Sequence, residues 1–193
     1  LKADAPIRML CCGRMVEKKG QRIAIEAFAS INDALPPAST LELIGSGPLE
    51  AELRRLADRL GVAKSVTFTG LLSRSRYLES VHAADLLLAP SITAPNGDTE
   101  GGAPTTILDA QSAGTIVVGS RHADIPFLIE DEVTGFLADE GDTHGLAMRI
   151  VHALDHATRW PRIAVTARSR IEELHSDAAV SAALVAAYGR LAP

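Results

Sequence analysis

Short apolar runs alternate with stretches of helical spacing along most of the 193-residue chain, and this alternation constrains the fold most. The apolar runs cover Ile7–Cys12, Thr40–Ile44, Ser65–Thr69, Asp85–Ala89 and Thr115–Gly119, with a shorter sixth at Gly135–Ala138. Short buried strands separated by helices require right-handed crossovers and a parallel sheet covered on both faces. The sequence therefore predicts an α/β fold with a single, doubly wound parallel sheet of about six strands.

The stretches between these runs are the predicted helices. They cover Gly20–Ala34, Leu49–Leu60 and Arg74–Ala84, and a further helix begins near Pro104. From Asp142 onward we expect no further strand but three extra C-terminal helices, with Pro161 separating the first two. These helices are predicted over Asp142–His156, Arg162–Leu174 and Asp177–Leu191. They either cap the sheet or reach towards a neighbouring domain.

Composition and charge exclude several classes of protein. Apolar residues make up 47% and charged residues 22%, as in an ordinary globular domain and unlike a disordered chain. The net charge is −5, which argues against a nucleic-acid partner. No apolar run reaches the roughly 18 residues that span a bilayer, and charged residues within the first twelve argue against a signal peptide. We therefore expect a cytoplasmic protein. The start at Leu1 rather than Met suggests a piece of a longer one.

Cysteine and histidine positions give no metal site. Cys11 and Cys12 are adjacent, so they point to opposite faces of a strand and are predicted to be small, buried apolar residues. His152 and His156 have the i, i+4 spacing of one helix face. We interpret that face as solvated rather than as a zinc site.

In an open parallel sheet, ligands bind beyond the carboxyl ends of the strands. The loop Gly13–Gly20 lacks the spacing of a Walker loop, but it places Arg14 and Lys19 beside a strand end. Two cations near a helix N-terminus suit a diphosphate. A solvated basic turn is the alternative.

Two further loops carry weaker signals. Gly45–Leu49 lacks the third glycine of a dinucleotide fingerprint, and its glycines serve either a turn or a close approach of backbone to a ligand. In Ser120–Pro126, either Arg121 or His122 could reach a phosphate, or both could be ordinary loop residues.

The longest loop, from Pro90 to Pro104, is of a length that is uncommon without a function. Where it ends, the helix is expected to leave the N–H groups of Thr105, Thr106 and Ile107 unpaired, an arrangement that binds phosphate. Asp98 and Glu100 precede that end, and Asp109 follows one turn into the helix. Carboxylates accept hydrogen bonds from vicinal hydroxyls, so the pattern indicates sugar or ribose recognition. An acidic surface loop that caps a helix is the alternative.

Taken in order, these blocks resemble the carboxyl-terminal domain of family 4 retaining glycosyltransferases. They are GRMVEKKG, LIGSGPL, VTFTG, DLLLAPS, EGGAPTTILDAQSAG, VVGSRHADIP and EVTGFLA, and the resemblance extends from about Ile7 to Tyr188. Bacterial enzymes that build extracellular polysaccharides such as colanic acid look most similar. In that family's GT-B fold, two Rossmann-like domains face each other; the carboxyl-terminal one binds the nucleotide-sugar donor and the amino-terminal one the acceptor. The resemblance implies that residues 1–193 form one Rossmann-like, nucleotide-sugar-binding half of a GT-B fold, and that the amino-terminal acceptor domain is absent from the chain.

The resemblance also implies roles for individual residues. Arg14 and Lys19 match the family's basic pair on the donor diphosphate, Glu100 matches the acid on the transferred sugar, and Asp109 matches the acid on the ribose. Glu100, Arg14 and Lys19 are thus the implied catalytic residues. The second acid is Asp where the family usually has Glu, and it follows Glu100 by nine positions rather than eight. A bulge at two glycines would absorb the extra residue. The other implied donor-binding positions are Gly47, Gly101, Gly102, Thr105 and Thr106, together with Phe68, Thr69, Gly70 and Leu71, which match the region that brackets the base.

The implied activity is transfer of a hexosyl group from a UDP-sugar or GDP-sugar to a glycan or lipid-linked acceptor, in polysaccharide biosynthesis. No metal or other cofactor is expected, because Arg14, Lys19 and the helix end would stabilise the departing diphosphate. The acceptor would bind through the missing amino-terminal domain, so the chain alone is expected to bind the donor without turnover. The whole protein is expected in the cytoplasm, at the inner face of the plasma membrane. A nucleotide-sugar epimerase and a non-catalytic nucleotide-binding module are the alternatives.

Overall fold

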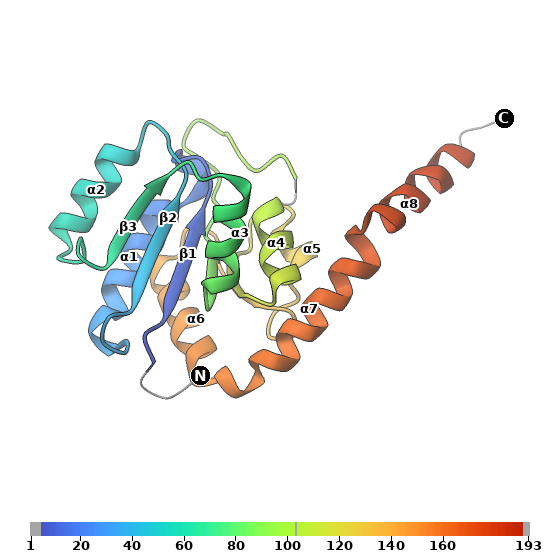
Figure 1. Ribbon diagram of the computed structural model, residues 1–193. Coiled ribbons are helices and arrows are strands. Elements are labelled where there is room, and N and C mark those ends of the chain that lie inside the picture. Colours follow the sequence, from blue (N-terminus) through green and yellow to red (C-terminus); the bar gives the residue numbers. More distant parts are fainter. Residues whose placement is uncertain (1–4, 103, 191–193) are drawn as a thin grey trace.

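The computed structural model describes residues 5–102 and 104–190, and its core is one parallel sheet with helices on both faces (Figure 1). The strand order is β3-β2-β1-β4-β5-β6, in which the chain returns to the centre of the sheet after β3. This is the doubly wound, Rossmann-like arrangement, so the predicted fold class is confirmed. The strands are β1 (Arg8–Cys12), β2 (Thr40–Ile44), β3 (Val66–Gly70), β4 (Leu86–Ala89), β5 (Ile116–Ser120) and β6 (Phe136–Ala138).

Eight α-helices and three 3₁₀ turns connect and cover the strands of the described chain. The 3₁₀ turns are Glu17–Lys19, Asn32–Ala34 and Ala157–Arg159. The helices are α1 (Gln21–Ile31), α2 (Glu50–Arg59), α3 (Arg74–Ala83), α4 (Thr105–Ala113), α5 (Ile125–Leu128), α6 (Thr143–Asp155), α7 (Trp160–His175) and α8 (Asp177–Gly189).

Alternate strand residues divide between two hydrophobic layers. Met9 and Cys11 pack with α1, α2 and α6 on one face, whereas Leu10 packs with α3, α4 and α5 on the other. Because successive side chains of a strand point to opposite faces, a strand buried on both sides reads as a continuous apolar run. This is why every predicted strand lies within one residue of its observed bounds.

Three details differ from the sequence prediction. Pro161 does not separate two helices: it lies in the first turn of α7, where its fixed φ fits and its missing N–H is not needed. The short helix α5 was not predicted, because four residues carry too little periodicity. The predicted end of the last helix, Leu191, lies outside the described residues, as do Ala103 in the long loop and residues 1–4.

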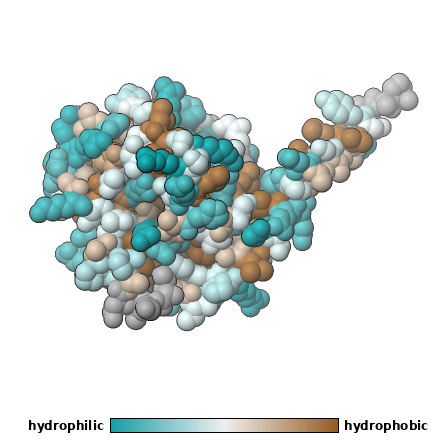
Figure 2. Space-filling model, in the orientation of Figure 1, coloured by the Kyte–Doolittle hydropathy of each residue, from teal (hydrophilic) through white to brown (hydrophobic). Residues whose placement is uncertain are grey.

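The three C-terminal helices have different surroundings. Helix α6 covers the sheet beside α1, α7 packs along α4, and α8 extends away from the sheet (Figure 1). None of residues 177–189 of α8 is buried, and this helix carries exposed apolar side chains (Figure 2). Among the described residues, no helix combines the length and the apolar character that crossing a membrane requires.

Candidate functional site

A pocket of about 720 Å³ opens at the carboxyl edge of the sheet, where the sequence placed its candidate loops. The loops after β1 and β2 form one side of it, and the segment after β3 leads to a wall made by α3. Arg14, Gly47, Leu71, Thr105, Thr106 and Asp109 all line this pocket. Six of the positions expected to bind a ligand are therefore brought together by the fold.

Part of the pocket lining is glycine backbone, in the loops that follow β1 and β2. The amide of Gly13 donates to Ile44 O at 2.9 Å, and the amide of Met15 donates to Ser46 O at 2.9 Å. At Gly47, a Cβ atom would lie 2.4 Å from Met15 O. Glycine at position 47 is therefore required by the contact between the two loops. That contact is a structural reason for this residue, beside the expected approach of a ligand.

Asp109 lies in the pocket and is held by two residues of α3. The hydroxyl of Tyr77 donates to Oδ2 of Asp109 at 3.0 Å, and Arg74 Nη2 lies 3.9 Å from Oδ1. Burial and the negative charge nearby raise the pKa of the Tyr77 hydroxyl, so it remains a donor at neutral pH. Arg74 and Tyr77 were not among the residues predicted from the sequence. Their i, i+3 spacing at the start of a helix that follows a strand end was the available signal.

The first turn of α4 differs in one detail from the sequence prediction. The sequence predicted three unpaired N–H groups, but the amide of Ile107 donates to Pro104 O at 3.0 Å. Such i→i+3 bonds are common at helix ends. Thr105 and Thr106 line the pocket, so it is this end of the helix that faces the cavity.

The two cations of the first loop are separated in the structure. Arg14 is exposed and lines the pocket, whereas Lys19 Nζ lies 2.8 Å from Glu100 Oε1 and 2.9 Å from Oε2. Ser91 Oγ also donates to Glu100 Oε1 at 2.8 Å. The side chain of Glu100 is only 8% exposed, and neither it nor Lys19 lines the pocket. The expected sugar-binding acid thus lies beside the first loop, where it forms an ion pair with Lys19.

Other expected positions lie outside the lining of the pocket. Phe68 pairs in register with Leu43, and its ring packs in the α1–α2 layer beneath Arg54, whose guanidinium carbon lies 4.4 Å from the ring centroid. The alternation along β3 explains this direction. Thr69 and Gly70, and likewise Gly101 and Gly102, do not line the pocket either. Of the region expected to bracket the base, only Leu71 reaches it.

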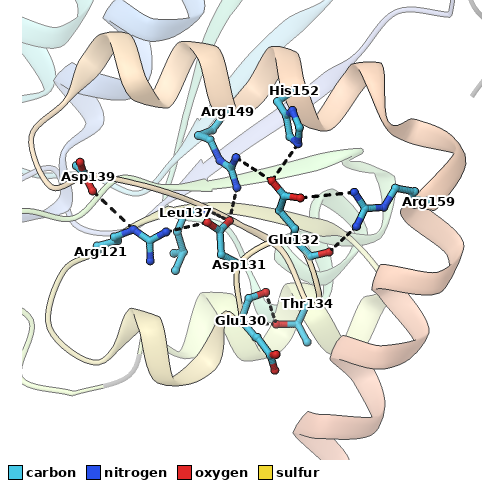
Figure 3. A network of polar contacts seen from close by, with 10 residues as sticks. All are labelled: Arg121, Glu130, Asp131, Glu132, Thr134, Leu137, Asp139, Arg149, His152 and Arg159. Carbon is cyan, nitrogen blue, oxygen red and sulfur yellow. Dashed lines mark hydrogen bonds and ion pairs between the residues drawn. The ribbon is translucent and has the colours of Figure 1, made fainter.

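Arg121 and His122 have distinct partners. Figure 3 shows Arg121 directed at Asp131 and Asp139, with a 2.7 Å contact to Asp131 Oδ2, in a network of polar contacts that includes Arg149 and Glu132. His122 is buried and contacts the long loop instead. In this structure neither side chain lines the pocket as a phosphate ligand.

The cysteines are buried or half-buried, as expected. Burial raises the pKa of Cys11 to about 12 and that of Cys12 to about 11. Cys12 lines the pocket, but its thiol is protonated at neutral pH and is therefore a poor nucleophile.

The predicted surroundings of His152 and His156 require one correction. His152 and His156 are half-buried rather than on a solvated face, because His152 packs edge-on against Phe136 at 5.8 Å and contacts Glu132. Among residues 5–102 and 104–190, no group of three His, Cys, Asp or Glu side chains is placed to hold a metal ion.

The sheet order and the position of the pocket define an α/β domain of the Rossmann-like class. The family model of the group 1 glycosyl transferases matches residues 6–156. The chain belongs to this family.

Three curated relatives are glycosyltransferases, and two of them are named for polysaccharide biosynthesis. The amylovoran biosynthesis glycosyltransferase AmsK of Erwinia amylovora is 36% identical over 170 residues, which are 86% of this chain and 40% of AmsK. WcaL of Salmonella typhimurium, named for colanic acid biosynthesis, is 31% identical over 91% of this chain and 43% of its own. A GDP-mannose-dependent phosphatidylinositol monomannoside mannosyltransferase of Mycolicibacterium smegmatis is 30% identical, with 86% and 43% covered. The chain thus spans about two fifths of the length of these relatives.

Solved structures agree with this fold. The crystal structure of Anabaena HepE in complex with UDP superposes with a TM-score of 0.82 at 25% identity, covering 96% of this chain and 49% of HepE. Sucrose-phosphate synthase of Thermosynechococcus elongatus superposes with a TM-score of 0.78 at 27% identity, with 99% and 46% covered. The chain therefore has the fold of one half-size domain of GT-B glycosyltransferases.

Proposed function

We propose that residues 1–193 are the donor-binding domain of a retaining hexosyltransferase that works in polysaccharide biosynthesis. The observation that carries this proposal is the pocket at the carboxyl edge, where Arg14, the first turn of α4 and Asp109 meet in one cavity. A cation and a helix N-terminus suit a diphosphate, and a carboxylate in the same pocket suits ribose hydroxyls. The similarity to HepE, whose structure contains UDP, supports a nucleotide diphosphate as the ligand.

The proposed roles follow from the positions of the side chains. Arg14 and the amides at Thr105 and Thr106 bind the diphosphate, Asp109 accepts hydrogen bonds from the ribose, and Leu71 contacts the base. Glu100 contacts the transferred sugar: its carboxylate accepts hydrogen bonds from the sugar hydroxyls and from Lys19 at the same time. Lys19, which pairs with Glu100, is the second cation proposed to stabilise the diphosphate.

Catalysis would use electrostatic stabilisation by these groups. Breaking the bond between sugar and phosphate develops negative charge on the departing diphosphate. Arg14 and the positive end of α4 are already in place to receive that charge, and preorganised groups of this kind lower the barrier without reorganising. Under this proposal a UDP-sugar or GDP-sugar needs neither a metal nor another cofactor.

The remaining assignments concern the whole protein. Relatives named for amylovoran, colanic acid and a phosphatidylinositol mannoside support a glycan or lipid-linked acceptor. An amino-terminal domain would bind that acceptor, at the inner face of the plasma membrane. The 193-residue chain alone would bind the donor and show no turnover. No histidine is among the described residues that line the pocket, which favours a transferase over an epimerase that needs a histidine as acid or base.

The test is a calorimetric titration of the chain with UDP and with GDP. We expect binding of one of them, and Arg14→Ala to weaken it roughly ten- to hundredfold, since a charge-assisted hydrogen bond contributes about 1.5–3 kcal/mol. Arg162→Ala, which removes an exposed arginine of α7, is the matched control and leaves affinity unchanged. Absence of binding of both nucleotides to the wild-type chain would contradict the proposed function. Sugar transfer by the purified chain would contradict the expected lack of turnover.

A further inference from the structure

His122 is a buried side chain that contacts the main chain of the proposed sugar-binding acid, Glu100. It follows β5 and is 2% exposed. Its Nε2 lies 2.9 Å from Thr99 Oγ1 and accepts a hydrogen bond from the amide of Glu100 at 3.3 Å. Its Nδ1 lies 2.9 Å from Glu140 Oε2.

These contacts determine which ring nitrogen carries the proton. The amide of Glu100 can only donate, so Nε2 of His122 must accept, and the hydroxyl of Thr99 donates to the same nitrogen. The ring proton is therefore on Nδ1 and is donated to the carboxylate of Glu140. The same carboxylate accepts a hydrogen bond from the amide of Thr93 at 2.6 Å.

The pair His122 and Glu140 thus joins the ends of three neighbouring strands. Glu140 follows β6, His122 follows β5, and Thr93 and Glu100 belong to the long loop after β4. Ser120 Oγ, two residues before His122, donates to Ser91 O at 2.5 Å, and Ser91 Oγ in turn donates to the carboxylate of Glu100. Both the main chain and the side chain of Glu100 are consequently held from β5 and β6.

The residues that follow Glu100 provide no such support. A Cβ atom at Gly101 or at Gly102 would have no other described atom within 4 Å, so the direction in which a side chain would project is open at both positions. Glycine also lowers the cost of alternative backbone angles. The direction of Glu100 therefore depends on its contacts with Lys19, Ser91 and His122.

We propose that His122, oriented by Glu140, is a positioning residue that holds Glu100 for contact with the donor sugar. This proposal rests on the proposed function. His122 is buried and does not line the pocket, so it acts through Glu100 and does not itself touch the donor. His122 therefore contributes only to the additional affinity that a nucleotide-sugar has over the bare nucleotide.

The experiment measures that part directly. Calorimetry gives the affinities of the chain for UDP and UDP-glucose, and for GDP and GDP-mannose; within each pair, their ratio is the sugar increment. His122→Asn keeps a donor for Glu140 but removes the acceptor near Glu100, and we expect it to reduce the increment roughly five- to tenfold, the effect of one hydrogen bond. Affinity for the bare nucleotide should stay within about twofold.

His122→Gln is the conservative variant. Its amide oxygen can reach the position of Nε2, so it should restore part of the increment. Nitrogen-15 spectra of the wild type should show His122 with its proton on Nδ1, and Glu140→Gln should alter that signal while circular dichroism reports an intact fold.

The outcomes separate this proposal from the function on which it rests. An unchanged increment in folded His122→Asn, a wild-type chain with no increment for either sugar nucleotide, or a proton on Nε2 would overturn the positioning role alone. A wild-type chain that binds neither UDP nor GDP would overturn the proposed function, and the positioning role with it.

Discussion

The hydroxyl of Tyr77 donates a hydrogen bond to Oδ2 of Asp109 across 3.0 Å, and so joins α3 to α4 inside the pocket. Aspartate is one methylene shorter than the glutamate usual at this position in the family that the sequence resembles. The contact with Tyr77 fixes the direction of this shorter carboxylate. Its second oxygen lies 3.9 Å from Arg74 Nη2, and the side chain of Asp109 is 25% exposed, so a ligand hydroxyl can reach it.

Tyr77→Phe should weaken binding of the preferred nucleotide about three- to tenfold, because Asp109 loses the donor that orients it. The loss should appear for UDP or GDP and not for inorganic pyrophosphate, which has no ribose. Calorimetry with both ligands measures this difference. Tyr188→Phe, at an exposed tyrosine of α8, is the control. An equal loss of pyrophosphate binding would contradict the role of Asp109 at the ribose.

Lys19→Ala should lower the stability of the chain as well as its affinity for the nucleotide. The substitution leaves the 8%-exposed carboxylate of Glu100 with a hydrogen bond but no countercharge. Because Lys19 is itself 25% exposed, water screens part of the effect, and we expect a loss of about 1–2 kcal/mol in urea unfolding. Lys19→Ala combined with Glu100→Gln should recover part of that stability. A double variant less stable than Lys19→Ala would show that the ion pair is not the cause.

Gly47→Ala should destabilise the fold by more than about 2 kcal/mol, since its Cβ would overlap Met15 O at 2.4 Å and the backbone must shift. Gly101→Ala is the matched control, because a Cβ there meets nothing within 4 Å. Thermal melting of the two variants checks the prediction. Equal melting temperatures would contradict the close packing of the first two loops.

Acid should destabilise the chain through Glu140 and Glu132. The amide of Thr93, and then His122, lowers the pKa of Glu140 below its usual 4.5, and the hydrogen bond from Arg149 does the same for Glu132. The folded state therefore binds fewer protons than the unfolded state, so this stability is present above pH 4.5 and is lost as the pH falls through the folded pKa values. Urea unfolding at pH 7 and below pH 4.5 measures it. Glu140→Gln should make the decline shallower, and a steeper decline would contradict the assignment.

The fold was predictable because its strands are buried on both faces. Val117 and Val118 face opposite layers, so both are apolar and the run is visible in the sequence. The direction in which an individual side chain points was not predictable in the same way. Phe68 belongs to a block that matches the family, yet the direction of its ring depends on its register in β3.

Two pocket-lining residues were predictable from residue type and position, because Arg14 follows a strand end and Asp109 lies one turn into the helix after the long loop. The pair Lys19–Glu100 spans 81 positions, so it becomes visible only once the sheet order places the loops after β1 and β4 side by side. The contacts of His122 depend in the same way on the adjacency of β4, β5 and β6. Tyr77 was missed because it belongs to a helix whose first turn reaches the edge that the loops define.

The backbone hydrogen bonds at Gly13 and Met15 join the first two loops, and Gly13, Gly45 and Gly47, which have no side chains, line that side of the pocket. Binding of a ligand on this side therefore orders few side chains of the protein and costs little conformational entropy. Substituting a side chain cannot readily reshape a surface built from peptide groups. Under the proposed function, selectivity between nucleobases would then depend on the side chains of Leu71 and Arg74, which line the pocket from the segment after β3 and from the start of α3. Redesign of ligand preference should begin with those two positions.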